Sequence, residues 1–213
     1  MKTLAVVQAR MGSTRLPGKV MRTIGHKRAI GWATAAAMRA PGVDSVVVAT
    51  SVNPENDRLE SWCNLNGVTC YRGSEDDVLD RYCGVIRTYD PTDIVRLTAD
   101  CPLLDSTVIG EAIALHQATG AVYTTNQWPP VWPDGLDVEV ISAQALLEAG
   151  EEATDKIDRD TVTQFIWRNQ SRWPASSLAC PLPGMEKERW VLDSQEDLEL
   201  IKLIVEDFPD EWV

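Results

Sequence analysis

Short apolar runs alternate with helical patterns along the first hundred residues, and this alternation constrains the fold more than any other feature of the chain. The strand-like runs cover residues 4–7, 46–49, 68–71 and 93–98. The helical patterns between them cover residues 28–40, 53–66 and 77–89. Strands and helices in alternation favour a parallel sheet with helices on both faces. We therefore predict one domain over residues 1–213, with a three-layer α/β/α, Rossmann-like fold and a mostly parallel central sheet.

The second half of the chain is less regular. We predict strands over residues 121–125, 136–141, 176–182 and 189–192, and helices over residues 106–119, 143–153, around 160–169 and from 194 onward. Asp105 is in the position of a helix N-cap. Residues 128–135 form a loop with three prolines and two tryptophans. The tryptophan rings either contact a ligand or another subunit, or they hold the loop against the rest of the domain.

The composition excludes several classes of partner. A net charge of −12 and a pI near 4.6 argue against a surface that binds nucleic acid or an anionic membrane. The sequence also shows no signal peptide and no apolar run of membrane-spanning length, so we expect a cytoplasmic protein. Five scattered cysteines and two histidines offer little for a zinc site or a disulfide framework. Carboxylates would have to hold any metal, which favours Mg²⁺.

A basic, glycine-containing loop follows the first strand and stands out against the acidic background. Arg10, Arg15 and Lys19 could surround a polyphosphate, and Gly12 and Gly18 allow close approach of the backbone. The spacing of the glycines does not match a Walker A loop, and the dinucleotide-binding glycine pattern is also absent. A solvated basic surface loop remains the simpler alternative.

Two carboxylates follow predicted strands, where ligands bind in parallel sheets. Asp100 comes directly after the strand at 93–98 and could coordinate a metal, because Asp105 fits the helix-cap role better. Asp193 follows the apolar run at 189–192, where either Asp193 or Ser194 could instead cap the last helix.

Residues 9–19 resemble the signature A-R-x-x-S-T-R-L-P-G-K of the CMP-sugar synthetases, and above all their spore-coat-polysaccharide-type branch. Four further blocks resemble the same cytidylyltransferase branch in the same order, at residues 72–82, 95–103, 133–139 and 193–198. Thr161 departs from the branch, which often carries His there, and the chain stops soon after its last helix. Both departures leave the acceptor and the subunit contacts open, including a homodimer.

The resemblance implies a role for many of these residues. Lys19, Arg15, Asp100 and Asp193 would be catalytic, and Asp100 and Asp193 would hold Mg²⁺. The nucleotide-binding set would be Gln8, Ala9, Arg10, Gly12, Ser13, Arg15, Lys19, Thr50, Arg72, Arg81, Thr98 and Ala99, with Ala9 and Arg10 meeting the cytosine through their backbone. Asp137, Glu139 and Arg159 would contact the acceptor.

The implied reaction transfers CMP from CTP to an acidic sugar or a phosphonate, with release of pyrophosphate. CTP and a small acidic acceptor would then be the partners, with Mg²⁺ as cofactor. Two alternative functions remain: a nucleotide-sugar-dependent glycosyltransferase and a catalytically silent nucleotide-binding subunit. The glycosyltransferase would normally need an Asp-x-Asp, which Asp100 does not provide, and the joint presence of Lys19, Asp100 and Asp193 speaks against the silent subunit.

Overall fold

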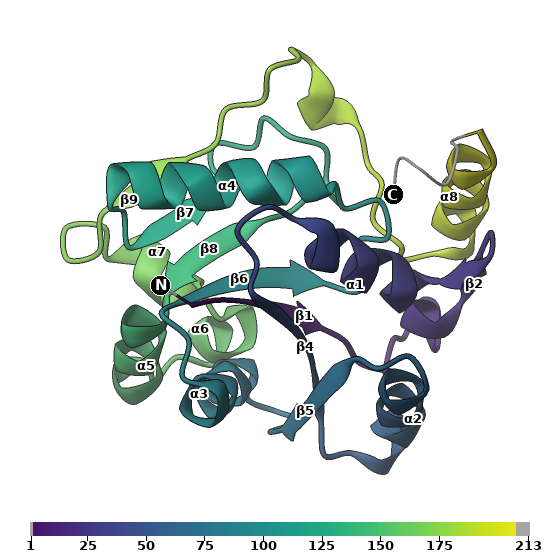
Figure 1. Ribbon diagram of the computed structural model, residues 1–213, viewed down its shortest axis with the longest axis horizontal. Helices are drawn as coiled ribbons and strands as arrows, with labels where there is room; N and C mark the ends of the chain where they lie inside the picture. The colour runs from purple at the N-terminus through teal and green to yellow at the C-terminus, as the bar shows by residue number, and fades with distance from the viewer. Residues whose placement is uncertain (1, 208–213) are drawn as a thin grey trace.

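A seven-stranded sheet forms the centre of the computed structural model, which describes residues 2–207 (Figure 1). Its strands are β1 Thr3–Gln8, β4 Ser45–Ser51, β5 Thr69–Gly73, β6 Asp93–Thr98, β7 Tyr123–Thr125, β8 Glu139–Ser142 and β9 Ala175–Ser177. They lie in the order β5-β4-β1-β6-β8-β7-β9. Every adjacent pair is parallel except those of β8, which runs antiparallel to β6 and β7. The prediction of a mostly parallel sheet is therefore confirmed.

Helices cover both faces of this sheet. They are α1 Ala29–Arg39, α2 Asp57–Leu65, α3 Val78–Tyr89, α4 Ser106–Thr119, α5 Ala143–Glu152, α6 Lys156–Thr161, α7 Gln164–Arg168 and α8 Gln195–Asp207. Short 3₁₀ turns occur at Lys19–Met21, Pro54–Asn56 and Met185–Lys187, and β2 Thr23–Ile24 pairs with β3 Lys27–Arg28 outside the main sheet. None of the described helices is long and apolar enough to cross a membrane.

The alternation of side chains along β1 explains the two layers. Ala5 and Val7 point into a core cluster formed with α1, α2 and α4, whereas Leu4 and Val6 point into a second cluster with α3, α5 and α7. All four side chains are buried, as expected of a central strand with a helical layer on each face. A third cluster packs α8 against α1 and β2.

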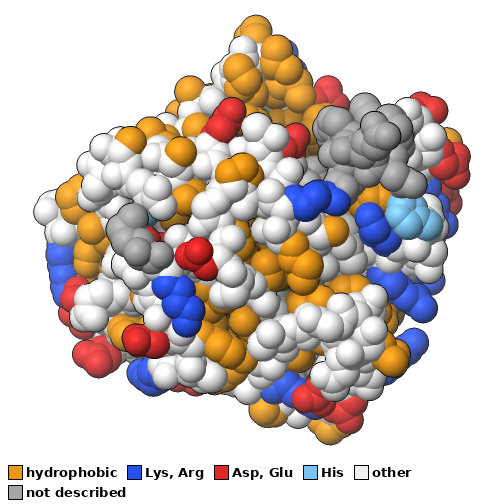
Figure 2. All heavy atoms as spheres, in the orientation of Figure 1, with side chains coloured by type: hydrophobic (Ala, Val, Ile, Leu, Met, Phe, Trp, Pro, Cys, Tyr) orange, Lys and Arg blue, Asp and Glu red, His pale blue; other side chains and the backbone are white. Residues whose placement is uncertain are grey.

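The surface carries mixed charges. On the face displayed in Figure 2, the described Lys and Arg side chains are scattered among acidic and apolar groups rather than gathered into a continuous basic field. This distribution agrees with the net charge of −12.

Asp105 caps α4, as the sequence predicts. Its Oδ1 accepts hydrogen bonds from the backbone N–H groups of Thr107, at 2.6 Å, and Val108, at 3.4 Å. The helix ends at Gly120, which adopts a left-handed conformation with φ of 63°. Because Asp105 satisfies the helix end, Asp100 is free for another role.

Several predicted boundaries in the second half are wrong. The strand predicted at 136–141 begins only at Glu139, because the side chain of Asn126 bonds the backbone of Leu136 and Val138 in place of a neighbouring strand. The strand predicted at 176–182 is limited to residues 175–177, and the one at 189–192 is reduced to an isolated bridge between Arg189 and Asp134.

The single helix predicted around 160–169 is also wrong. The structure has two short helices, α6 and α7, separated by Val162 and Thr163. Val162 has a φ of 72°, a conformation in which a right-handed helix cannot continue. Apolar spacing alone did not reveal this break, because Val162 and Ile166 are both buried in the same core cluster.

Candidate active site

A cavity of about 620 Å³ lies at the carboxyl ends of β1 and β6. We name it the loop pocket, because most of its lining belongs to the loop after β1. It is lined by Gln8, Ala9, Arg10, Gly12, Ser13, Thr14, Arg15, Lys19, Val20, Thr98, Asp100 and Asp193. The predicted basic loop thus forms a concave site together with both carboxylates, rather than an isolated patch of surface.

Lys19 lies between the two carboxylates that the sequence singled out. Its Nζ is 2.5 Å from Asp100 Oδ2 and 2.5 Å from Asp193 Oδ1. Its side chain is only 13% exposed. Burial lowers the pKa of Lys19, but Asp100 and Asp193 more than offset that effect, so the pKa lies above its usual value. Lys19 is therefore a firmly charged ammonium group that offsets the repulsion between the two carboxylates.

The start of a 3₁₀ turn presents Lys19 to this position. Gly18 adopts a left-handed conformation with φ of 67° directly before Lys19, and its N–H donates to the carbonyl of Met11. This conformation is costly for a residue with a Cβ, so Gly18 is needed for the backbone to turn here. Lys19 thereby lines the loop pocket together with Arg10 and Arg15.

Asp193 does not cap the last helix. Ser194 and Asp197 form a reciprocal cap instead, in which Ser194 Oγ accepts from the N–H of Asp197 and Asp197 Oδ2 accepts from the N–H of Ser194. Asp193 is left to bind Lys19, and its carboxylate also contacts Arg15 at 2.7 Å and Arg189 at 3.3 Å. Desolvation would raise the pKa of Asp193, but Lys19 and these arginines hold it below its usual value.

The same pair of carboxylates would suit a magnesium ion in place of the Lys19 ammonium group. Because Asp100 and Asp193 both reach one nitrogen atom at 2.5 Å, their oxygens converge on a single point. No group of three or more His, Cys, Asp or Glu side chains occurs within residues 2–207 that could hold a metal ion by itself. Mg²⁺ suits such a site, since it is commonly bound by one or two carboxylates together with water and substrate phosphates.

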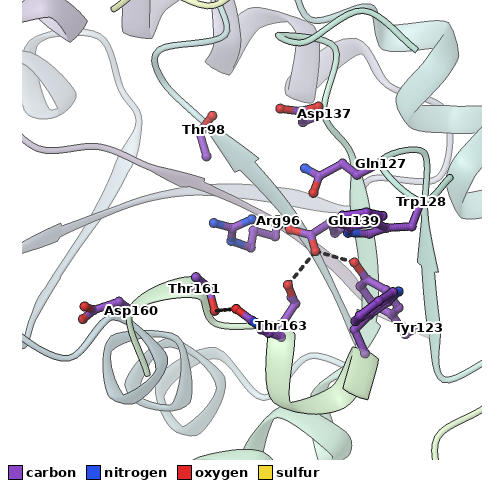
Figure 3. A pocket seen from close by; sticks show the side chains of 12 residues that line it. Arg96, Thr98, Tyr123, Gln127, Trp128, Asp137, Glu139, Asp160, Thr161 and Thr163 are labelled. Atoms are coloured by element: carbon purple, nitrogen blue, oxygen red, sulfur yellow. Dashed lines mark hydrogen bonds and ion pairs between the residues drawn. The ribbon is translucent and has the colours of Figure 1, made fainter. Parts of the chain in front are cut away.

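A second cavity of about 550 Å³ adjoins the first, and Thr98 lines both (Figure 3). We name it the indole pocket after Trp128 and Trp167, whose ring centroids are 5.1 Å apart. Its lining is Arg96, Thr98, Tyr123, Gln127, Trp128, Asp137, Glu139, Asp160, Thr161, Thr163, Gln164 and Trp167. The predicted acceptor residues Asp137 and Glu139 are among these.

Glu139 is the centre of a buried hydrogen-bond network in the indole pocket. Its carboxylate pairs with Arg96 and accepts hydrogen bonds from Tyr123 and Thr163, each at 2.6 Å (Figure 3). Burial lowers the pKa of Arg96, but Glu139 outweighs that effect and raises it. Glu139 therefore joins β6, β7 and β8 to the segment before α7.

Asp137 has a different environment. It belongs to no ion pair among the described residues, and burial raises its pKa to about 7, with further contributions from Asp134 and Glu139. The two carboxylates predicted for one strand face therefore differ: Glu139 is neutralised by a partner, whereas Asp137 is not.

The two tryptophans of the 128–135 loop have different roles: one is positioned to contact a ligand, and the other anchors the loop. Trp128 is 48% exposed and lines the indole pocket. Trp132 packs against the core and donates from Nε1 to the carbonyl of Leu178 at 2.9 Å. One ring is thus available to a ligand, and the other holds the loop in place.

Five predicted site residues lie outside the lining of both pockets: Thr50, Arg72, Arg81, Ala99 and Arg159. Thr50 and Ala99 are fully buried. Arg72 pairs with Asp57 and Glu60 on the side of α2. Arg159 binds Asp77 and the carbonyls of Gly150 and Ala153.

Arg81 has an indirect relation to the site. It is buried, and its guanidinium donates to the carbonyls of Ser74 and Glu75. Glu75 and Asp76 line a smaller cavity of about 360 Å³, which shares Gln8 and Arg10 with the loop pocket. Arg81 therefore supports one wall of the region beside the loop pocket.

Sequence reasoning missed Arg96, Tyr123, Thr163 and Trp167 as site residues. Of these four, only Arg96 could have been recognised from the sequence, because a cation within a buried apolar strand requires an acidic partner. Thr163 and Trp167 follow the helix break at Val162, which the apolar pattern did not reveal.

Comparisons with known proteins agree with this geometry. A family model described as cytidylyltransferase matches residues 4–206. The chain is 34% identical over 207 residues to the spore coat polysaccharide biosynthesis protein SpsF of Bacillus subtilis, covering 94% of this chain and 85% of that protein. It is 32% identical over 115 residues to a 3-deoxy-manno-octulosonate cytidylyltransferase of Pelobacter propionicus, covering 53% of this chain and 44% of that enzyme.

A solved structure supports the same grouping. A cytidylyltransferase from Leptospira borgpetersenii superimposes with a TM-score of 0.94 at 28% identity, covering 100% of this chain and 90% of that one. The resemblance of the five sequence blocks is thereby confirmed over nearly the whole chain.

Proposed function

The chain belongs to the cytidylyltransferase family and is a CTP-dependent nucleotidyltransferase, and from that premise we propose that it transfers CMP to an acidic sugar or a phosphonate, with Mg²⁺ and release of pyrophosphate. The observation that carries the proposal is the convergence of Lys19, Asp100 and Asp193 in the pocket lined by the basic loop. Phosphate-binding cations and metal-binding carboxylates are the two sets of groups that nucleotidyl transfer requires.

Each group has a distinct task in this reaction. Arg10, Arg15 and Lys19 bind the triphosphate, and Lys19 stabilises the charge that develops on the departing pyrophosphate. Asp100 and Asp193 would hold Mg²⁺, which would supply Lewis-acid activation of the phosphate and of the attacking oxygen. Little covalent chemistry is required of the protein, so orientation and charge supply most of the rate acceleration.

Gln8 gives a physical reason for a preference for CTP. It lines the loop pocket, and its Oε1 is buried with no hydrogen-bond partner among the described residues. The exocyclic amino group of cytosine can donate to this oxygen, whereas uracil presents a carbonyl there and could pair only if the Gln8 amide turned over to donate from Nε2. The N–H of Ala9 already donates to Ala49, so Ala9 can offer only its carbonyl to the base.

The acceptor enters from the indole pocket. This cavity adjoins the loop pocket at Thr98, so a molecule bound there reaches toward Asp100 and the α-phosphate. Arg159, predicted as an acceptor contact, is engaged elsewhere by Asp77, and we assign the acceptor contacts instead to residues that line the pocket.

The test is to incubate the protein with each nucleoside triphosphate, Mg²⁺ and a panel of acidic sugars and phosphonates, and to measure pyrophosphate release. We expect release with CTP that stops in excess chelator. Asp100→Asn and Asp193→Asn should each weaken metal-dependent turnover, whereas Asp207→Asn, at an exposed position at the end of α8, serves as the matched control. Full turnover in chelator would refute the metal mechanism, and no pyrophosphate from any acceptor would refute the proposed reaction.

A further inference from the structure

The indole pocket contains more carboxylates than cations. Its ionisable lining residues are Arg96, Asp137, Glu139 and Asp160, together with the phenol of Tyr123. Arg96 is committed to Glu139, which also takes the hydroxyl hydrogens of Tyr123 and Thr163. Both oxygens of Glu139 are engaged in this network, whereas the buried Nε of Arg96 has no hydrogen-bond partner among the described residues. Arg96 is the only cation among the described residues of the pocket wall, and its charge is paired with Glu139.

Asp137 and Asp160 remain available to a ligand. Neither carboxylate belongs to an ion pair among the described residues. Asp137 is the more buried of the two, and its raised pKa reflects a location in which a charged carboxylate lacks a partner. A cation bound beside Asp137 would offset the desolvation free energy of its charged carboxylate.

The loop pocket has the opposite character. Its three cations, Arg10, Arg15 and Lys19, outnumber its two carboxylates, so the anionic end of an acceptor is directed toward the loop pocket rather than toward Asp137. The part of the acceptor that enters the indole pocket meets Asp137, the side-chain amides of Gln127 and Gln164, and the indole rings. Indole faces also attract cations.

We propose that the acceptor is a zwitterion, whose anionic group lies toward the loop pocket and whose ammonium group enters the indole pocket and pairs with Asp137. This inference rests on the proposed cytidylyl transfer and narrows its substrate class. An amino sugar acid and an aminoalkyl phosphonate share the required chemistry, which is an anion at one end and a protonated amine at the other.

Two matched pairs of acceptors test the inference. The first pair is 8-amino-3,8-dideoxy-manno-octulosonate and 3-deoxy-manno-octulosonate, and the second is 2-aminoethylphosphonate and 2-hydroxyethylphosphonate. Within each pair only an amine replaces a hydroxyl. With CTP and Mg²⁺, pyrophosphate release should show a kcat/KM about tenfold or more higher for the amine of the reactive pair, because a charge-assisted hydrogen bond to a carboxylate is stronger than a neutral one. The pair that reacts identifies the sugar or the phosphonate class.

Two variants and one modified acceptor test whether Asp137 causes the preference for the amine. N-acetylation of the amine should remove the preference, because it removes the charge. Asp137→Asn should bring the ratio of kcat/KM between amine and hydroxyl close to one, whatever its effect on the absolute rate. Asp160→Asn is the matched control at an exposed carboxylate of the same pocket and should retain most of the ratio.

The outcomes separate this inference from the function on which it rests. Turnover without a preference for the amine overturns the zwitterion and leaves cytidylyl transfer standing. If no acceptor releases pyrophosphate, calorimetry with the same four compounds in the presence of CTP and Ca²⁺ decides the matter. Tighter binding of an amine then supports the zwitterion although the reaction has failed, and equal or absent binding overturns it.

Discussion

The loop pocket and the indole pocket meet at Thr98, yet they are assembled in opposite ways. All but three of the residues that line the loop pocket belong to the single stretch 8–20. The indole pocket instead takes its residues from β6, β7, the 127–128 segment, β8, α6 and α7, together with Asp137 before β8 and Thr163 before α7. A pocket built from one segment can be recognised from local sequence, whereas one built from many elements depends on how they pack.

The two pockets also differ in how their charges are balanced. In the loop pocket, Lys19 lies between Asp100 and Asp193, so opposite charges compensate one another. In the indole pocket, one carboxylate, Glu139, is compensated by Arg96 and another, Asp137, is not. The loop pocket is thus prepared for an anion and a metal, and the indole pocket for a hydrogen-bond donor. Four predictions follow from this contrast.

The largest effect should come from breaking the compensated pair of the indole pocket. Glu139→Ala should lower the free energy of unfolding by about 3–5 kcal/mol, because it leaves Arg96 as an unpaired buried charge. Urea denaturation measures the loss. Glu148→Ala, which removes a partly exposed partner of Arg172, is the control and should cause no comparable loss. Equal effects of both variants would show that Glu139 is not an energetic centre.

The unpaired carboxylate of Asp137 should make the stability of the protein depend on pH. Asp137 has a pKa raised from 3.8 to about 7 in the folded protein, so the folded state holds its proton more tightly than the unfolded state. The contribution of Asp137 to stability therefore falls as pH rises from about 4 to 7 and is constant above that range. Asp137→Asn, which resembles the protonated form, should be more stable than wild type by about 2–4 kcal/mol at pH 8.

Thermal or urea unfolding at pH 4, 6 and 8 measures this difference. The gap between Asp137→Asn and wild type should grow with pH and vanish near pH 4. Asp160→Asn, at an exposed position, should show no such growth. A gap that is independent of pH would mean that Asp137 titrates normally and that the indole pocket is compensated after all.

In the loop pocket, removing Lys19 should affect catalysis. Lys19→Ala should reduce turnover about 100- to 1000-fold, or roughly 3 kcal/mol in the transition state, because Lys19 acts on leaving-group charge. Pyrophosphate release measures the rate, and circular dichroism checks that the variant is folded. Lys187→Ala, at an exposed position, is the control. Unchanged turnover in a folded Lys19→Ala variant would remove Lys19 from the catalytic assignment.

The smallest effect concerns the base at the edge of the loop pocket. CTP should bind more tightly than UTP by about 1–3 kcal/mol, because a group built to pair with the amino group of cytosine is left unpaired by uracil. Size should exclude ATP and GTP. Competition calorimetry with the four triphosphates measures the order, and Gln8→Ala should reduce the difference between CTP and UTP. Equal binding of CTP and UTP would contradict the base preference.

Much of the first half of the molecule was predictable. The alternation of strands and helices through residue 98, the cap at Asp105 and the basic loop after the first strand all rest on local signals, namely the spacing of apolar residues, capping residues and turn residues. The errors fall in the second half, at residues 136–141, 160–169, 176–182 and 189–192. There, Asn126 replaces a strand, a positive φ at Val162 divides a helix, and Arg189 forms only a single bridge.

The sequence by itself determined the layered architecture, the loop with its cations and the position of Asp100 directly after a strand, because each depends on residues close together in the chain. Only the tertiary structure decided which charges meet. Lys19 reaches Asp100 and Asp193 across 81 and 174 positions, and Arg96 reaches Glu139 across 43. Pairing over such distances is set by strand order and side-chain packing, which no local pattern encodes. For the same reason Asp137, two residues from Glu139, kept its charge unmatched while its neighbour did not.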